Sequence, residues 1–171
     1  ISLLAAAQIV TASPDNSIAI SVANDGSAFS VSRRSEPLIV DSPLGLDLSG
    51  GSLESLELKS VKRRAVSRSL PMVATKAARA ADVYNATTLT FQAKGAIART
   101  LKIEVRAYDD GVAFRYVLPD GSPTKLRGER TQFKLDSDLS CLASEYVSSH
   151  ENNWKFLKLA AMDVGKAYEI P

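Results

Sequence analysis

Apolar and polar residues alternate along most of this chain, and clusters of turn-forming residues separate the alternating runs. The clearest example surrounds Asp110-Gly111, where every second residue is apolar from Leu101 to Ala107 and again from Val112 to Leu118. A period of two gives a strand one buried face and one exposed face. An Asp-Gly pair between two such runs favours a tight turn, because glycine readily adopts positive φ. This stretch therefore predicts an antiparallel hairpin.

The same rhythm recurs before and after this hairpin. We expect an alanine-rich stretch, residues 70–82, to form an irregular segment or a single helical turn, since it is too short for a stable isolated helix. Asp41-Ser42-Pro43 is expected to end a strand. Many short strands separated by turns predict an all-β sandwich. Further strands are predicted at residues 9–11, 18–22, 28–33, 37–40, 59–68, 83–93, 129–135 and 167–170.

Composition agrees with an ordinary globular domain and argues against two classes of partner. The chain has 171 residues, of which 45% are hydrophobic and 23% charged, and its net charge is +2. This charge is too small to indicate a nucleic-acid partner, and no run of 18 apolar residues predicts a membrane span. The short basic clusters at 33–34 and 62–64 are expected to be solvated. Cys141, the single cysteine, is predicted to be a small buried hydrophobic residue.

Three motifs resemble those of one enzyme family. The hairpin sequence from Tyr108 to Tyr116 is similar to a hairpin in the N-terminal domain of glycoside hydrolase family 97, which groups mostly bacterial α-glucosidases and α-galactosidases. The turn from Ser13 to Ser17, with the strand after it, resembles the family's opening turn. The segment from Ser42 to Leu46 resembles its "S-x-L-G-L" segment. The resemblance extends from about Ile9 to Pro171.

This resemblance implies a two-sheet antiparallel super-sandwich similar to galactose mutarotase. Family members continue into an (α/β)₈ catalytic barrel, so we expect residues 8–171 to be a truncated N-terminal domain, interrupted at its C-terminal end and lacking the barrel. Residues 1–7 resemble the end of a secretory signal peptide, although a first strand or short helix is an alternative. The family's usual location and these residues predict a periplasmic or secreted protein.

The resemblance also assigns candidate site residues. Glycosidases need two carboxyl groups across the scissile bond, and in this family both belong to the barrel, so we expect no catalytic residue here and no activity from this chain alone. The adjacent pair Asp109-Asp110 is interpreted as turn-forming. Residues 150–154 resemble a loop that supplies one ligand to an active-site calcium, which implies that role for Glu151. The alternative is an exposed loop acid.

Two neighbours of Glu151 are candidate carbohydrate contacts. His150 could hydrogen-bond sugar hydroxyls or orient Glu151, and Trp154 could stack on a sugar face; a solvated loop histidine and a packing tryptophan are the alternatives. The leading hypothesis is a domain that packs on its own catalytic barrel, shapes a pocket for an α-glucoside or α-galactoside and lends a calcium ligand. The rivals are a stand-alone carbohydrate-binding sandwich and a purely structural β domain. The sequence leaves sugar identity, retention or inversion, and oligomeric state open.

Overall fold

The computed structural model describes residues 7–49, 51–52, 56–73, 76–94, 99–118, 125–135 and 139–169. The predicted signal remnant lies outside these residues except for Ala7, whose carbonyl accepts a 3.0 Å hydrogen bond from the Asn24 N–H. No helix of the described chain is long and apolar enough to cross a membrane. The chain divides into two compact units, Ile1–Lys134 (unit 1) and Leu135–Pro171 (unit 2).

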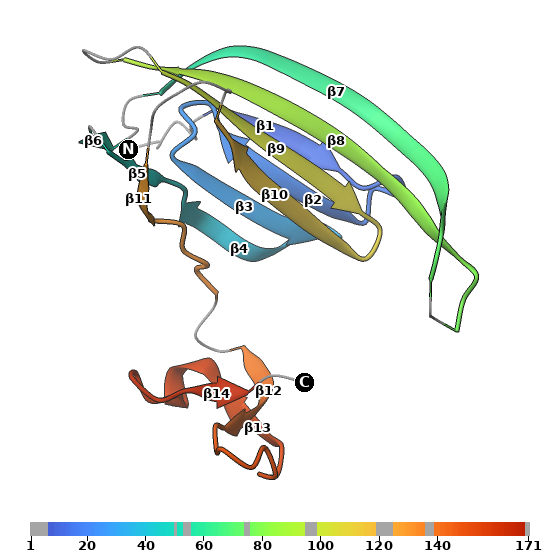
Figure 1. Ribbon diagram of the computed structural model, residues 1–171, viewed down its shortest axis with the longest axis vertical. Coiled ribbons are helices and arrows are strands. Elements are labelled where there is room, and N and C mark those ends of the chain that lie inside the picture. The colour runs from blue at the N-terminus through green and yellow to red at the C-terminus, as the bar shows by residue number, and fades with distance from the viewer. Residues whose placement is uncertain are drawn as a thin grey trace. The chain divides into compact units, whose positions relative to one another are not determined.

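Unit 1 contains two four-stranded antiparallel sheets and a small third sheet (Figure 1). The first sheet has the order β1-β2-β3-β4, the second β10-β9-β8-β7, and the third β11-β5-β6. The strands are β1 (Gln8–Ala12), β2 (Ile18–Ala23), β3 (Ala28–Arg33), β4 (Glu36–Pro43), β5 (Leu46–Leu48), β6 (Gly51–Ser52), β7 (Leu56–Pro71), β8 (Arg79–Ala93), β9 (Thr100–Tyr108), β10 (Gly111–Val117) and β11 (Leu126–Glu129). The predicted all-β sandwich is confirmed.

The core of unit 1 lies between the two large sheets. Every second residue of β9 from Leu101 to Ala107 is buried, as the alternation predicted, and the opposite face carries polar side chains. The predicted hairpin pairs β9 with β10, with Gly111 opposite Tyr108 across the Asp109-Asp110 turn. The core cluster contains these buried apolar residues of the two large sheets: Ile9, Ile18, Ile20, Val22, Phe29, Val31, Leu56, Leu89, Phe91, Leu101, Ile103, Val105 and Ala107.

The central hairpin connects the two other motifs that carried the family resemblance. At its turn, the Asp109 side chain accepts a 3.0 Å hydrogen bond from the Asp15 N–H in the opening turn. On β10, the Tyr116 hydroxyl accepts a 3.0 Å hydrogen bond from the Gly45 N–H and lies 2.8 Å from the Thr131 Oγ1. The three motifs therefore form one set of contacts that holds the sandwich together.

Three details differ from the sequence-based expectation. β4 does not end at Asp41, which adopts a positive φ of 45° in an irregular stretch of pairing with β3. Of the alanine-rich stretch, the described residues 72–73 and 76–78 are irregular, which is one of the two predicted alternatives, but its ends are strands: β7 continues to Pro71 and β8 begins at Arg79. There, cross-strand partners such as Arg68 and Asp82, whose side chains are 2.6 Å apart, override the helix propensity of alanine.

The third difference concerns residues 129–135. The strand β11 ends at Glu129, and residues 130–135 are not in a strand. Phe133 instead packs with its ring 5.6 Å from that of Phe29 and 6.4 Å from that of Phe114. The alternating residues predicted a strand. The segment is instead tied to the sandwich by these ring contacts and by hydrogen bonds from the Arg130 N–H to the Gly45 carbonyl (2.9 Å) and from the Gln132 N–H to the Pro43 carbonyl (3.1 Å).

Unit 2 is a small three-stranded antiparallel sheet with the order β13-β12-β14. Its elements are β12 (Ser140–Glu145), β13 (Lys155–Lys158), the 3₁₀ turn η1 (Leu159–Ala161) and β14 (Tyr168–Glu169). Among its described residues only Ala143 and Ser144 are buried. Cys141 is half-buried, less than predicted, with its Sγ 3.6 Å from the Met162 Sδ.

Candidate functional site

The three candidate site residues lie in the loop that joins β12 to β13 in unit 2. His150 begins this stretch with a positive φ of 55°, a conformation that histidine tolerates better than most residues. Its Nδ1 is 2.5 Å from the Glu169 Oε1 on β14, and its ring meets that of Tyr146 edge-on at 5.4 Å. Contacts with both β14 and the start of the loop therefore fix the His150 side chain.

Glu151 stands between two anchored residues. After it, the Asn152 side-chain amide donates a 2.9 Å hydrogen bond to the Glu145 carbonyl at the end of β12. Before it, His150 contacts Glu169. Glu151 itself is exposed. This arrangement fixes the backbone on both sides of Glu151 and leaves its carboxylate on the surface. A metal ion that is also bound by another module would have to lie there.

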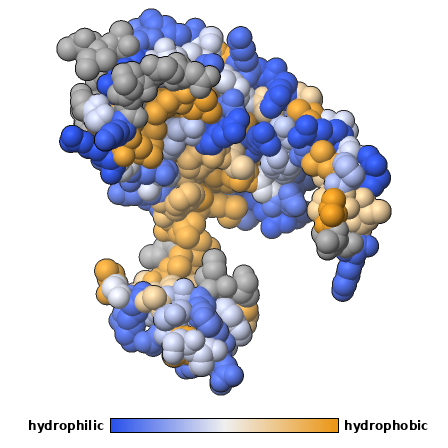
Figure 2. All heavy atoms as spheres, viewed as in Figure 1, coloured by the Kyte–Doolittle hydropathy of each residue, from blue (hydrophilic) through white to orange (hydrophobic). Residues whose placement is uncertain are grey.

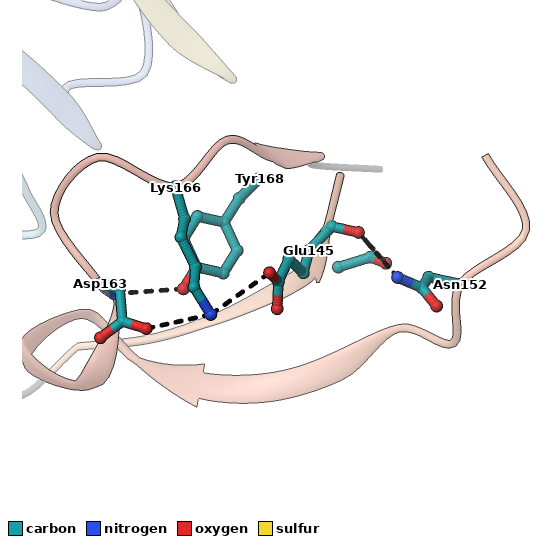
Figure 3. A network of polar contacts seen from close by, with 6 residues as sticks. Glu145, Asn152, Asp163, Lys166 and Tyr168 are labelled. Atoms are coloured by element: carbon teal, nitrogen blue, oxygen red, sulfur yellow. Dashed lines mark hydrogen bonds and ion pairs between the residues drawn. The ribbon is translucent and has the colours of Figure 1, made fainter. Parts of the chain in front are cut away.

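A polar network flanks this loop and was not predicted (Figure 3). The Lys166 Nζ lies 3.3 Å from the Glu145 Oε1 and 3.2 Å from the Asp163 Oδ2. Two hydrogen bonds raise the pKa of Lys166, of which the one to Asp163 contributes more than the one to Glu145. The Tyr168 hydroxyl accepts a 3.1 Å hydrogen bond from the Asp163 N–H. The ammonium group is therefore held between two carboxylates.

The network borders a cavity of about 480 Å³. Its polar lining includes Glu145, Asn152, Asn153, Lys155, Asp163 and Lys166. No local sequence pattern predicts this cavity, because its walls come from three separate parts of unit 2.

The remaining candidates behave differently. Trp154 comes last in the loop and is 44% exposed, so its ring is accessible but does not anchor a core. Asp109 and Asp110 occupy the hairpin turn of unit 1, where the Asp109 carboxylate accepts the hydrogen bond from Asp15. Within the described residues no group of three or more His, Cys, Asp or Glu residues could hold a metal ion. The roles of His150, Glu151 and Trp154 stay predictions.

Sequence comparison places this chain beside carbohydrate-active enzymes. The family model described as glycosyl-hydrolase 97 N-terminal matches residues 11–171. A retaining α-galactosidase of Bacteroides thetaiotaomicron is 24% identical over 186 aligned residues, covering 100% of this chain and 27% of that protein. A protein of Streptomyces bingchenggensis named probable retaining α-galactosidase is 34% identical over 137 residues, covering 80% of this chain and 21% of that protein.

Structural comparison shows the same fold. A glycoside hydrolase family 97 enzyme of Pseudoalteromonas sp., solved in complex with panose, superposes with a TM-score of 0.75 at 21% identity over 90% of this chain and 25% of its own. The same enzyme in complex with acarbose gives a TM-score of 0.74. A β-arabinopyranosidase gives 0.72 at 21% identity, over 86% of this chain and 26% of its own. The chain thus spans about a quarter of the length of these proteins.

Proposed function

The chain belongs to the N-terminal family of glycoside hydrolase 97, and from that premise we propose that it packs on a catalytic module and completes a carbohydrate pocket. The observation that carries this proposal is the surface of unit 2. Tyr146, Trp154 and Phe156 are exposed there, while the described part of the unit buries only two residues. A sheet this small needs outside packing to be stable, and aromatic residues are enriched in protein interfaces. A covering catalytic module would supply that packing.

Calcium binding is the second part of the proposal. Ca²⁺ takes 6–8 oxygen ligands, and Glu151 can supply one or two of them, with the others coming from the catalytic module. The anchoring of His150 and Asn152 supports this role because it holds the Glu151 backbone in place. A bound calcium would contribute positive charge that orients and polarises substrate oxygens. His150 and Trp154 would line the same pocket.

The whole protein would be an α-glycosidase exported to the periplasm or the medium. The names of the two sequence relatives favour an α-galactoside and a retaining mechanism. The complexes of the structural relative with panose and acarbose keep an α-glucoside as the alternative substrate. We expect the 171-residue chain by itself to be inactive, because the family resemblance assigns both catalytic carboxyl groups to the barrel.

The test uses the polypeptide that carries this chain together with its proposed catalytic module. Calorimetric titration of the metal-free protein with calcium should show at least a tenfold weaker affinity for Glu151→Gln, about 1.4 kcal/mol. The matched control is Glu36→Gln, which changes an exposed acid at the start of β4 and should leave the affinity unchanged. Hydrolysis of aryl α-galactoside and α-glucoside substrates should identify the sugar.

The rival hypothesis of a stand-alone carbohydrate-binding sandwich gives the opposite result. Under our proposal the isolated chain should bind calcium, galactose or maltose only weakly, because the catalytic module supplies the other residues of the pocket. Micromolar binding of a sugar by the isolated chain, abolished by Trp154→Ala, would support the rival. An unchanged calcium affinity in Glu151→Gln would remove Glu151 from the metal site.

A further inference from the structure

A groove in unit 1 lies beside two unpaired strand edges. Its volume is about 360 Å³, and its walls include Val10 and Ala12 of β1, Arg63 and Ala65 of β7, and Asn85 of β8. Within the described chain β1 pairs only with β2, and β7 pairs only with β8. Figure 1 shows β7 as the outermost strand of its sheet. In the described chain no further strand pairs with the backbone N–H and C=O groups along these edges, although the Ala12 carbonyl already accepts a hydrogen bond from Asn85.

The walls of the groove are held in place by contacts between the sheets. The Thr11 hydroxyl donates a buried 2.6 Å hydrogen bond to the Thr87 hydroxyl. The Asn85 side-chain amide donates a 2.9 Å hydrogen bond to the Ala12 carbonyl. These contacts fix β1 relative to β8, so the groove is formed before any ligand arrives and binding costs little reorganisation.

Positive charge is concentrated at this edge. Residues 62–82 contain six Lys or Arg and one Asp, a net charge of +5, whereas the whole chain carries +2 and the other residues therefore carry −3. Arg68 is the one that pairs with Asp82. Arg63 and Arg64 are exposed at the groove, and no ion pair links them to another described residue. The groove thus combines open backbone edges with two available guanidinium groups.

Apolar residues extend the same ribbon past the groove. β8 pairs with β9 only as far as Asn85, so beyond it β7 and β8 form a two-stranded ribbon. Leu70, Met72 and Val73 are exposed near the tip of this ribbon, and Figure 2 shows hydrophobic atoms at that end of the molecule. A partner lying along the ribbon would meet guanidinium groups first and apolar side chains farther out.

We propose that this groove accepts an extended peptide segment rich in carboxylates, which adds as a strand to the free edge of β1 and faces Arg63 and Arg64. Strand addition provides backbone hydrogen bonds, and carboxylates supply charge-assisted contacts to the arginines. A second copy of this chain fits poorly, because its own basic ribbon would face this one and like charges repel. The inference does not depend on the proposed catalytic role.

The first experiment compares three labelled nine-residue peptides by fluorescence anisotropy with the 171-residue chain. One alternates valine and glutamate, the second alternates valine and lysine, and the third keeps the glutamates but has two central prolines that prevent strand pairing. The first peptide should bind at least tenfold more tightly than the other two. Equal binding of the first and third peptides would show that the groove binds polyanions in general, and it would overturn the proposal. A short single-stranded DNA of equal charge tests the same alternative, and DNA binding as tight as that of the first peptide would also overturn the proposal.

The second experiment tests the residues. Arg63→Glu with Arg64→Glu should weaken binding of the acidic peptide at least tenfold, while Arg33→Glu with Arg34→Glu makes the same change of charge two strands away from β1 and should have a much smaller effect. Amide hydrogen exchange in Gln8–Ala12 should slow when the peptide binds, because β1 gains a neighbour. Equal loss in both double variants, unchanged exchange in β1, or concentration-dependent dimerisation through this edge would overturn the proposal. Circular dichroism confirms that both variants are folded.

Discussion

The two units of this chain use their apolar residues in opposite ways. In unit 1 the apolar side chains of two sheets face each other, and Phe91, for example, is completely buried. In unit 2 the comparable side chain Phe156 is 82% exposed on a three-stranded sheet that has almost no interior. Burial of apolar surface is the main stabilising contribution in folding. Unit 1 can therefore be stable by itself, whereas unit 2 exposes apolar side chains that a partner would cover.

Truncating the two phenylalanines provides the strongest test of this contrast. Phe91→Ala should reduce the free energy of unfolding by about 3–5 kcal/mol, because it leaves a cavity in the core. Phe156→Ala should change it by about 0.5 kcal/mol or less in the isolated chain. Urea denaturation followed by tyrosine and tryptophan fluorescence measures both. A large loss for Phe156→Ala would show that unit 2 has packing of its own and would remove the main support for a covering module.

Replacing one glycine in each unit tests the same contrast through the backbone. Gly26 has φ +68°, and a Cβ there would lie 3.0 Å from the Leu56 Cδ1 and 3.3 Å from the Phe91 ring. Gly26→Ala should therefore cost about 2–3 kcal/mol, from left-handed backbone strain and from crowding in the core. Gly165 has φ +95° with no atom within 4 Å of an added Cβ.

Gly165→Ala should cost only about 1–2 kcal/mol of local strain, and this cost should stay in unit 2. Hydrogen exchange measured by mass spectrometry separates the two outcomes. Gly26→Ala should speed exchange throughout β2, β8 and β9, and Gly165→Ala should speed it only near β12 and β14. Global acceleration in both variants would mean that the two units unfold as one.

Removing one tyrosine hydroxyl from each unit should also destabilise unit 1 more than unit 2, but by a smaller amount. Tyr116→Phe leaves the half-buried Gly45 N–H without its acceptor and should cost about 1–2 kcal/mol. Burial raises the pKa of Tyr116, so its hydroxyl stays neutral up to a higher pH than that of a solvated tyrosine. Tyr168→Phe removes an acceptor from the exposed Asp163 N–H, which water can replace, and should cost less than about 0.5 kcal/mol. Thermal unfolding of both variants at pH 7 tests the ranking.

Local pattern was enough to predict most strands of unit 1. The hairpins β2–β3 and β9–β10 have their turn residues and their alternation within one short stretch, so the sequence contains all the information needed to place them. The prediction was wrong where distant contacts decide. Arg79 to Asp82 became a strand because β7 pairs with it, and residues 130–135 follow aromatic contacts that involve Phe133.

The candidate site shows the same limit more strongly. His150 and Glu151 were chosen through resemblance to a family loop, but the Glu169 partner of His150 is 19 residues away and has no local signal. The Lys166 network joins Glu145 at the end of β12 to the turn before β14. Pairing between short strands brings these residues together, and short strands with little buried surface leave the weakest pattern in a sequence.

The smallest predicted effect is a pH dependence in the opening turn of unit 1. The Ser13 hydroxyl (2.6 Å) and the Ser17 N–H (2.8 Å) donate to the Asp15 Oδ1 and hold the pKa of Asp15 well below its usual value of 3.8. A lowered folded-state pKa means that the unfolded chain binds the proton more readily, so stability falls as pH drops. The contribution of Asp15 is complete above about pH 5, starts to be lost near 3.8 and declines further below it.

Asp15→Asn should therefore lower the urea midpoint at pH 6 and show a smaller drop than the wild type between pH 6 and pH 3. Ser13→Ala removes one of the two donors and should give a slope between those of the wild type and Asp15→Asn, because the Ser17 N–H remains. The turn is joined to the central hairpin through the Asp109 carboxylate, so acid should loosen β9–β10 before it alters β12. If hydrogen exchange at low pH rose first in β12, the opening turn would not be the acid-sensitive part of the chain, and the contrast between a self-sufficient unit 1 and a dependent unit 2 would extend to acid as well.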